Sequence, residues 1–198
     1  MAHRNSIWQL TSAITLAFIL SACQSSSLSS SSSIDHPDQF TTIEEKVESW
    51  IRILSIEEKA GQMIQAERSA NNGESGITQG ETTKYRIGSI LNGGGNVPNP
   101  NTINGWWTMT NAYRNASLYT PSGIPIIYGA DAVHGHNNVK DATIFPHNIG
   151  LAAANNPDLM RDIAEVTAYE MKLTGVQMTF APSIGIIKDV RWGRTFET

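Results

Sequence analysis

Apolar residues recur at helical spacing early in the chain, directly after two helix-start signals. Thr42 and Ser55 each precede a glutamate by three residues, which is the capping-box pattern of a helix N-terminus. The apolar positions after Thr42 lie on one face of a helix, and they are Val47, Trp50, Ile51 and Leu54. The pattern therefore predicts two short helices in series. The Gly-, Asn- and Thr-rich stretch 71–83 predicts a loop.

Short apolar runs predict strands that alternate with further helices. The runs cover 87–91, 125–128, 176–181 and 184–187. A helical pattern spans 104–119, with Trp107, Ala112 and Leu118 available for one face. A second helix begins at Asn156-Pro157-Asp158 and has Gly175 as its C-cap, with the apolar stripe Leu159, Ile163, Val166 and Leu173. Alternating strands and helices predict an α/β fold with a parallel sheet.

Length and charge narrow the classes of protein that fit this pattern. The 198 residues, 40% of them hydrophobic, suit one domain with an ordinary core. Fourteen Lys and Arg stand against 18 Asp and Glu, which gives a net charge of −4. Nucleic-acid binding needs a basic face, and the sequence has no basic stripe.

The N-terminus has the layout of an export signal. Residues 1–23 combine a short basic start, an apolar run and small residues before Cys23. Leu20-Ser-Ala-Cys23 resembles the bacterial lipobox, which implies lipidation of Cys23 and a place at the cell envelope, on the outer-membrane or periplasmic side. A cleaved signal with an incidental cysteine is the alternative. Residues 24–40 read as a serine-rich tether, and 41–198 as the folded domain.

Charged residues stand where two of the predicted strands end. Asp131 follows the run 125–128, and Asp189, Arg191 and Arg194 follow 184–187. Ligands gather at the C-terminal ends of parallel strands. A carboxylate accepts hydrogen bonds from vicinal sugar hydroxyls and a guanidinium donates to them, so Asp131 and Arg194 suit sugar binding. A structural salt bridge between two loops is the alternative for Asp189 and Arg191.

Three other patterns have weaker functional interpretations. His134, His136 and His147 lie near Asp131, but no cysteine or second acidic ligand joins them, so we expect loop hydrogen bonds and no metal site. The cluster 93–95 lacks the rest of a phosphate-binding loop and predicts a tight glycine turn. The pair 106–107 could stack on a sugar, although packing of the two tryptophans is the favoured interpretation.

Five segments together resemble the N-terminal barrel domain of glycoside hydrolase family 3. They are Glu58-Lys-Ala-Gly-Gln-Met63, Gly88-Ser-Ile-Leu-Asn-Gly-Gly-Gly95, Tyr128-Gly-Ala-Asp-Ala-Val-His-Gly135, Ala142-Thr-Ile-Phe-Pro-His-Asn148 and Arg191-Trp-Gly-Arg-Thr-Phe-Glu197. The resemblance runs from about residue 41 to the last residue, in the branch of β-glucosidases and β-glucan exohydrolases. It implies part of a (β/α)₈ barrel.

The same resemblance implies an activity. It is the retaining, exo-acting hydrolysis of terminal β-D-glucosyl residues from β-glucosides or β-glucan oligosaccharides, without a cofactor. The family's glucose-binding aspartate falls on Asp131, and the arginine of its Arg-Trp-Gly-Arg motif falls on Arg194. Asp141 stands where the family usually has glycine.

The resemblance implies that the nucleophile and the acid lie beyond Thr198, the last residue, and so it places no catalytic residue within this chain. A (β/α)₈ barrel takes roughly 250 residues. We therefore expect an N-terminal fragment that is inactive alone, its partners being the rest of the barrel and a second domain. The alternatives are a β-N-acetylhexosaminidase of the same family and a non-catalytic, tethered glycan-binding lipoprotein.

Overall fold

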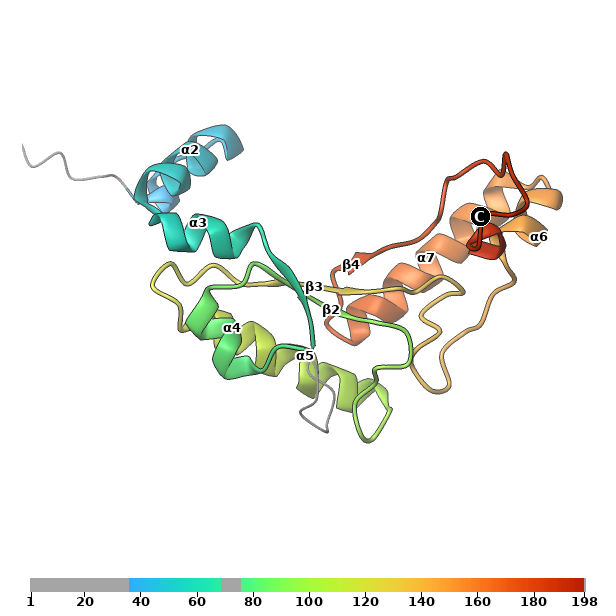
Figure 1. Cartoon of the computed structure of the whole chain (residues 1–198), viewed down its shortest axis with the longest axis horizontal. Coiled ribbons are helices and arrows are strands. Elements are labelled where there is room, and N and C mark those ends of the chain that lie inside the picture. The colour runs from blue at the N-terminus through green and yellow to red at the C-terminus, as the bar shows by residue number, and fades with distance from the viewer. Residues whose placement is uncertain (1–35, 69–75, 198) are drawn as a thin grey trace, which may run out of the picture.

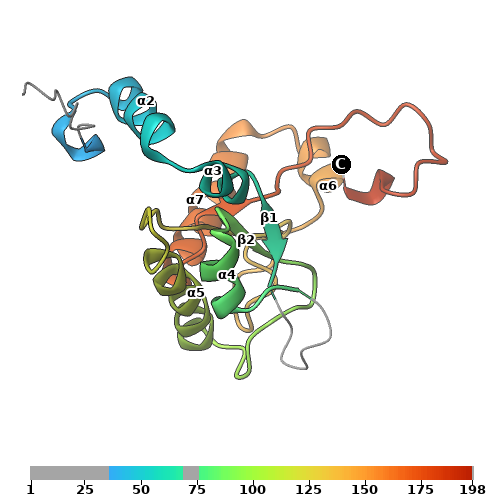
Figure 2. The same ribbon diagram turned by 60° about the vertical axis from the view of Figure 1, so that its left-hand side comes forward.

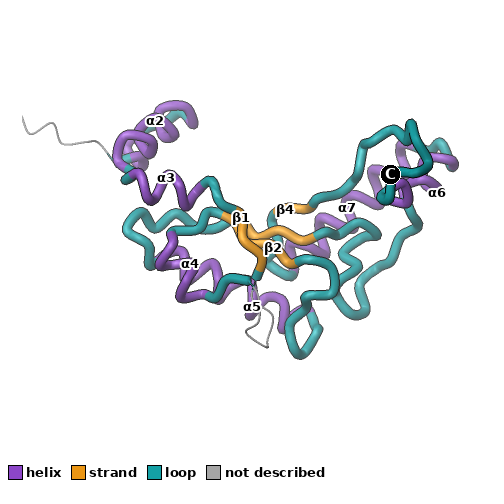
Figure 3. The backbone as a smooth tube through the Cα atoms, viewed as in Figure 1, coloured by secondary structure: helices purple, strands orange, loops and turns teal. Residues whose placement is uncertain are grey.

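A four-stranded parallel sheet forms the centre of the computed structural model, which describes residues 36–68 and 76–197 (Figures 1 and 3). The strands lie side by side in chain order, and they are β1 (Gln65–Glu67), β2 (Ser89–Asn92), β3 (Ile127–Ala130) and β4 (Met178–Thr179). Consecutive strands of a (β/α)₈ barrel are arranged in this way. The predicted α/β class is confirmed. The export signal, Cys23, most of the tether and Thr198 lie outside the described residues.

The described residues also form six α-helices and two 3₁₀ turns. They are η1 (Pro37–Gln39), α2 (Ile43–Ile53), α3 (Ile56–Gln62), α4 (Gln79–Tyr85), α5 (Ile103–Leu118), α6 (Asn148–Ala153), α7 (Pro157–Leu173) and η2 (Thr195–Glu197). Helices α4 and α5 lie together on one face of the sheet in two views (Figures 1 and 2). The Thr83 hydroxyl of α4 donates to the Ala116 carbonyl of α5 at 2.7 Å. None of the described helices is long and apolar enough to cross a bilayer.

The predicted helix starts are confirmed, and a third was missed. At Thr42 and Ser55 the side chain accepts from the backbone N–H three residues on, and the glutamate there accepts from the cap residue in return. Thr78 and Glu81 form the same reciprocal pair and begin α4. The predicted loop over 71–83 is therefore wrong from residue 79 onward, because polar composition concealed a capping box; residues 71–75 lie outside the described residues.

The core lies between the sheet and α5. Ile90 of β2 and Tyr128 of β3 pack in one buried cluster with Trp106 and Tyr113 of α5. Trp106 is fully buried and its indole N–H donates to Asn101 Oδ1 at 2.8 Å, so the packing interpretation is confirmed for this tryptophan. The predicted face of α5 is wrong, because Trp107 and Leu118 are 46% and 43% exposed.

Among the remaining elements, some of the sequence predictions are confirmed and others are wrong. Helix α7 begins after Asn156 as predicted and ends at Leu173. Gly175 follows as a C-terminal cap, with a φ of +75° and an N–H that donates to the Lys172 carbonyl at 3.2 Å. Strand β4 is shorter than predicted. The run 184–187 is not a strand, since no other strand pairs with it in the described ranges, and Ile184 is 90% exposed. Strand β1 was missed because its three residues are polar or small.

Candidate functional site

The candidate site lies at the C-terminal ends of β2, β3 and β4. Asp131 directly follows β3, and the Thr179 hydroxyl of β4 donates to its backbone carbonyl at 3.0 Å, which fixes this backbone. A Cβ atom added to Gly94, in the loop after β2, would lie 4.0 Å from Asp131 Oδ2. The Asp131 carboxylate is half-buried and faces a glycine turn. The turn itself is closed by the Asn96 N–H, which donates to the Gly93 carbonyl at 3.1 Å, as the sequence predicts.

The charge of Arg194 acts on Asp131, but the Arg194 guanidinium forms its ion pair with Glu197. The Arg194 Nε donates to Glu197 Oε1 at 2.8 Å, and its terminal nitrogen donates to the other carboxylate oxygen. Burial raises the pKa of Asp131; the charge of Glu197 raises it further, and the charge of Arg194 opposes this. The hydrogen bond from Arg194 lowers the pKa of Glu197. Sequence reasoning missed Glu197, although its i+3 spacing from Arg194 is a signal for such a pair.

Two histidines connect the loop after β3 to the segment that carries Arg194. The rings of His134 and His147 meet edge to face with centroids 4.3 Å apart. His134 Nδ1 bonds the Phe145 carbonyl, and His147 Nδ1 bonds the Phe196 carbonyl of η2, each at 3.2 Å. The predicted role of these histidines in loop hydrogen bonding is confirmed. Figure 1 shows the red C-terminal segment running from β4 to lie beside α6.

Within the described ranges, no three or more His, Cys, Asp or Glu side chains gather in an arrangement that could hold a metal ion.

Asp189 and Arg191 form a salt bridge, but not the one between two loops that was the alternative interpretation. The Arg191 terminal nitrogen lies 2.5 Å from Asp189 Oδ2, and its Nε donates to Oδ1 at 3.0 Å. Both side chains belong to one exposed loop, so the pair does not join two loops. Arg194 and Asp131, by contrast, come from segments far apart in the sequence.

A buried polar network beneath the glycine turn was not predicted. Arg68, which follows β1, is 5% exposed and donates to Asn96 Oδ1 and to the Val97 carbonyl, the latter at 3.0 Å. Asn92 of β2 donates to the Asn96 carbonyl, and the Tyr128 hydroxyl donates to Asn92 Oδ1. Burial raises the pKa of Tyr128. The network connects β1, β2 and β3 to the turn that faces Asp131. The sequence did not predict this network, because Arg68 follows a short polar segment that has no recognisable pattern.

Comparison with known proteins identifies the family of the chain. Residues 55–198 match the model of the family described as "Glycosyl hydrolase family 3 N terminal domain". A lysosomal beta glucosidase of Dictyostelium discoideum is 39% identical over 157 residues, which are 73% of this chain and 19% of that protein.

Solved structures of other proteins superpose on this chain. An exo-1,3/1,4-beta-glucanase of a Pseudoalteromonas species superposes with a TM-score of 0.69 at 38% identity, covering 78% of this chain and 19% of that one. A beta-N-acetylglucosaminidase of Paenibacillus superposes with a TM-score of 0.57 at 22% identity, covering 67% of this chain and 25% of that one, which supports the fold alone. The chain spans about a fifth of the length of the first two relatives.

Proposed function

This chain belongs to glycosyl hydrolase family 3, and we propose that it acts in the exo-type, retaining hydrolysis of terminal β-D-glucosyl residues. The names of two relatives, a beta glucosidase and an exo-1,3/1,4-beta-glucanase, support glucose as the sugar. The substrates are then β-glucosides or β-glucan oligosaccharides. The proposal rests mainly on one observation, which is the half-buried Asp131 carboxylate beside the Arg194–Glu197 pair.

Asp131 and Arg194 have complementary roles in this proposal. An ionised carboxylate accepts hydrogen bonds from two adjacent hydroxyls, and a guanidinium donates to a third oxygen. Glu197 orients the Arg194 guanidinium through two hydrogen bonds and leaves its remaining N–H groups for the sugar. The turn at Gly94 leaves room beside the carboxylate, because a side chain there would approach Asp131 Oδ2.

We propose that the reacting carboxylates belong to a segment beyond Thr198, because Asp131 is assigned to the sugar hydroxyls and Glu197 is unsuited to proton donation. A general acid needs a pKa raised toward the working pH. Arg194 lowers the pKa of Glu197, so this side chain is a poor proton donor at neutral pH. We therefore expect the 198-residue polypeptide by itself not to hydrolyse an aryl β-glucoside. Turnover of that substrate by the purified chain would contradict this part of the proposal.

Calorimetric titration with glucose tests the binding role. Asp131→Asn should weaken glucose binding roughly ten- to a hundredfold, because hydrogen bonds to a charged group contribute about 1.5–3 kcal/mol. Asp158→Asn is the matched control, since Asp158 is another aspartate beside an arginine but lies on the exposed surface of α7. Equal glucose affinity in the two variants would contradict the assignment.

We also propose that Cys23 is lipidated after export and holds the domain at the cell envelope. The support is the lipobox-like Leu20-Ser-Ala-Cys23 and the serine-rich stretch that follows it. Labelling of bacteria with an alkyne fatty acid should mark the wild-type chain and not Cys23→Ser. Equal labelling of the two would rule out this anchor.

A further inference from the structure

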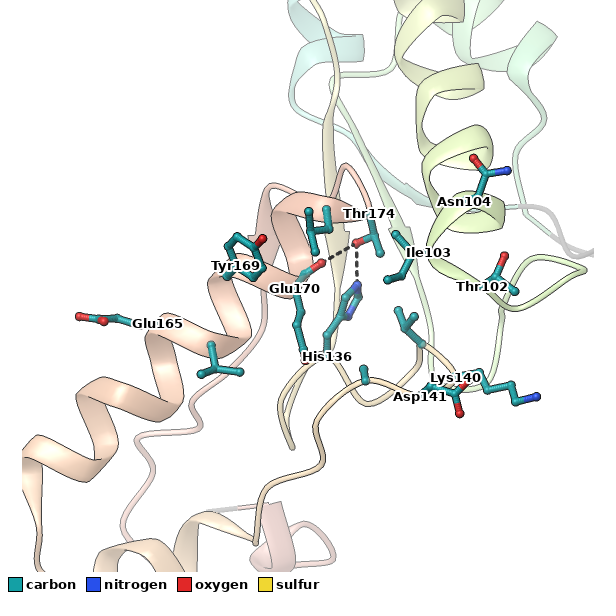
Figure 4. Close-up of a pocket in the computed structure, with 14 residues that line it drawn as sticks. Thr102, Ile103, Asn104, His136, Lys140, Asp141, Glu165, Tyr169, Glu170 and Thr174 are labelled. Atoms are coloured by element: carbon teal, nitrogen blue, oxygen red, sulfur yellow. Dashed lines mark hydrogen bonds between the residues drawn. The ribbon is translucent and has the colours of Figure 1, made fainter.

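A cavity lies between the start of α5 and the C-terminal half of α7 (Figure 4). Its volume is about 810 Å³, within the range of small-molecule sites. None of its lining residues belongs to the Asp131, Arg194 and Glu197 cluster. The cavity therefore needs an explanation of its own.

The innermost polar group of the cavity is the His136 imidazole, which is fully buried. Its Nε2 lies 2.8 Å from the Thr174 hydroxyl. That hydroxyl is placed to donate its one hydrogen to a backbone carbonyl, of Met171 at 2.8 Å or of Glu170 at 3.4 Å. We assign the tautomer from this network: with the hydrogen on a carbonyl, Thr174 accepts from His136, and Nε2 carries the imidazole proton. Burial lowers the pKa of His136 to about 4, which keeps the ring neutral at pH 7.

The other ring nitrogen is then an acceptor that lacks a donor. Nδ1 of a neutral imidazole protonated at Nε2 has a free lone pair. It is buried, and no hydrogen-bond partner reaches it from the described part of the chain. A buried acceptor without a donor is unfavourable, so this atom favours a ligand that brings an O–H or N–H group.

The rest of the lining restricts which donor fits. Val139, Val166 and Leu173 supply apolar surface, and the Tyr169 ring is 64% exposed. The cavity has three carboxylates and one ammonium, from Lys140, which disfavours an anionic ligand. Glu170, one of the three, already accepts from the Thr143 backbone and hydroxyl at 3.1 and 2.8 Å. A neutral ligand with hydroxyl donors around an apolar C–H face matches the apolar surface and the His136 acceptor, and a cationic amine is the competing class of ligand.

We propose that this cavity is a second saccharide-binding site. One sugar hydroxyl donates to His136 Nδ1, and a sugar face lies on the exposed ring of Tyr169, which combines an apolar surface with a polar tip. The site holds sugar without transforming it. The proposal does not depend on the Asp131 site, and the two are separable by mutation.

The test follows the ¹⁵N signal of His136 Nδ1 in the full chain carrying Asp131→Ala, which disables the first site. Cellobiose is the probe, up to about 30 mM, enough to saturate a site with a Kd of about 1 mM. We expect a saturable shift of the Nδ1 signal, because a new hydrogen bond changes the shielding of that atom. No saturable shift would overturn the proposal, as would a shift produced by putrescine but not by cellobiose.

A pair of variants on α7 locates the effect. Leu173 lines the cavity and is 41% exposed, and Leu159 is 40% exposed on the same helix without lining it. Leu173→Trp should fill the cavity and raise the Kd for cellobiose at least tenfold, to about 10 mM or more. Leu159→Trp should leave the response unchanged. An identical response in both folded variants would place cellobiose elsewhere and contradict the proposal.

Discussion

The charges of Asp131 and Arg194 influence each other's pKa, although Arg194 forms its ion pair with Glu197. The guanidinium opposes the rise in the pKa of Asp131, and the carboxylate adds to the rise in the pKa of Arg194. The two side chains come from the end of β3 and from the segment that leads into η2. A sugar placed between them would meet an acceptor on one side and a donor on the other.

Glu197→Gln should lower the pKa of Asp131. The substitution removes a negative charge that raises this pKa and releases the Arg194 guanidinium toward the remaining carboxylate. Carboxyl ¹³C titration of Asp131 measures the change. Asp189→Asn is the control, because Asp189 pairs with Arg191 in an exposed loop. An unchanged pKa in Glu197→Gln would show that the three groups are not coupled.

The stability of the chain should fall as the pH drops from 6.5 toward 4. His136 has its pKa lowered from 6.5 to about 4 by burial, so the unfolded chain binds a proton in this window that the folded chain does not. The loss is at most about 1.4 kcal/mol per pH unit. Urea unfolding across this range should give a shallower pH slope for His136→Gln than for wild type. Equal pH slopes in the two proteins would contradict the burial of a neutral His136.

Two glycines should respond in opposite ways to alanine. A Cβ atom on Gly88 would lie 2.5 Å from the Gln62 backbone oxygen, so Gly88→Ala should destabilise the fold by about 1–3 kcal/mol or more. A Cβ atom on Gly80 of α4 meets nothing within 4 Å, and Gly80→Ala should stabilise by up to about 1 kcal/mol. Thermal unfolding measures both. Similar shifts of Tm in the two variants would refute the close approach of residues 62 and 88.

Asp141→Gly should stabilise the loop after β3. Asp141 has a φ of +68°, the left-handed region that costs most side chains about 1–2 kcal/mol and glycine nothing. Part of this gain is offset by the greater freedom of glycine in the unfolded chain, so we expect a net gain of up to about 1 kcal/mol. Asp141→Val, which suits this region poorly, should be the less stable of the two in urea unfolding. The reverse order would contradict the backbone assignment.

The sequence predicted those parts of the fold that local chemistry determines. The capping boxes at Thr42 and Ser55, the start of α7 and its glycine cap all depend on neighbours within a few residues, and all are present. Elements that depend on distant partners were harder. Strand β1 is polar and exists because β2 pairs with it, and the apolar run 184–187 has no pairing partner among the described residues.

The residues of the candidate site also divide into those that the local sequence predicts and those that depend on distant partners. Asp131 could be named because a lone carboxylate follows a buried strand, and Arg194 because it lies in a recognisable motif. Arg68 and Asn96 could not, since their importance comes from a buried network that joins segments 28 residues apart. The role of Glu197 became visible only when the structure showed its carboxylate on the Arg194 guanidinium.

The most direct test of the central claim is a chimera. Residues 55–198 of this chain replace the matching segment of the Pseudoalteromonas exo-1,3/1,4-beta-glucanase, which is 38% identical. Hydrolysis of an aryl β-glucoside is then measured with and without Asp131→Asn. We predict an active chimera whose kcat/KM falls about ten- to a hundredfold or more with Asp131→Asn and stays unchanged with Asp158→Asn. A chimera that folds, as circular dichroism shows, but has no activity, or whose two variants behave alike, would contradict the assignment of Asp131 to the sugar.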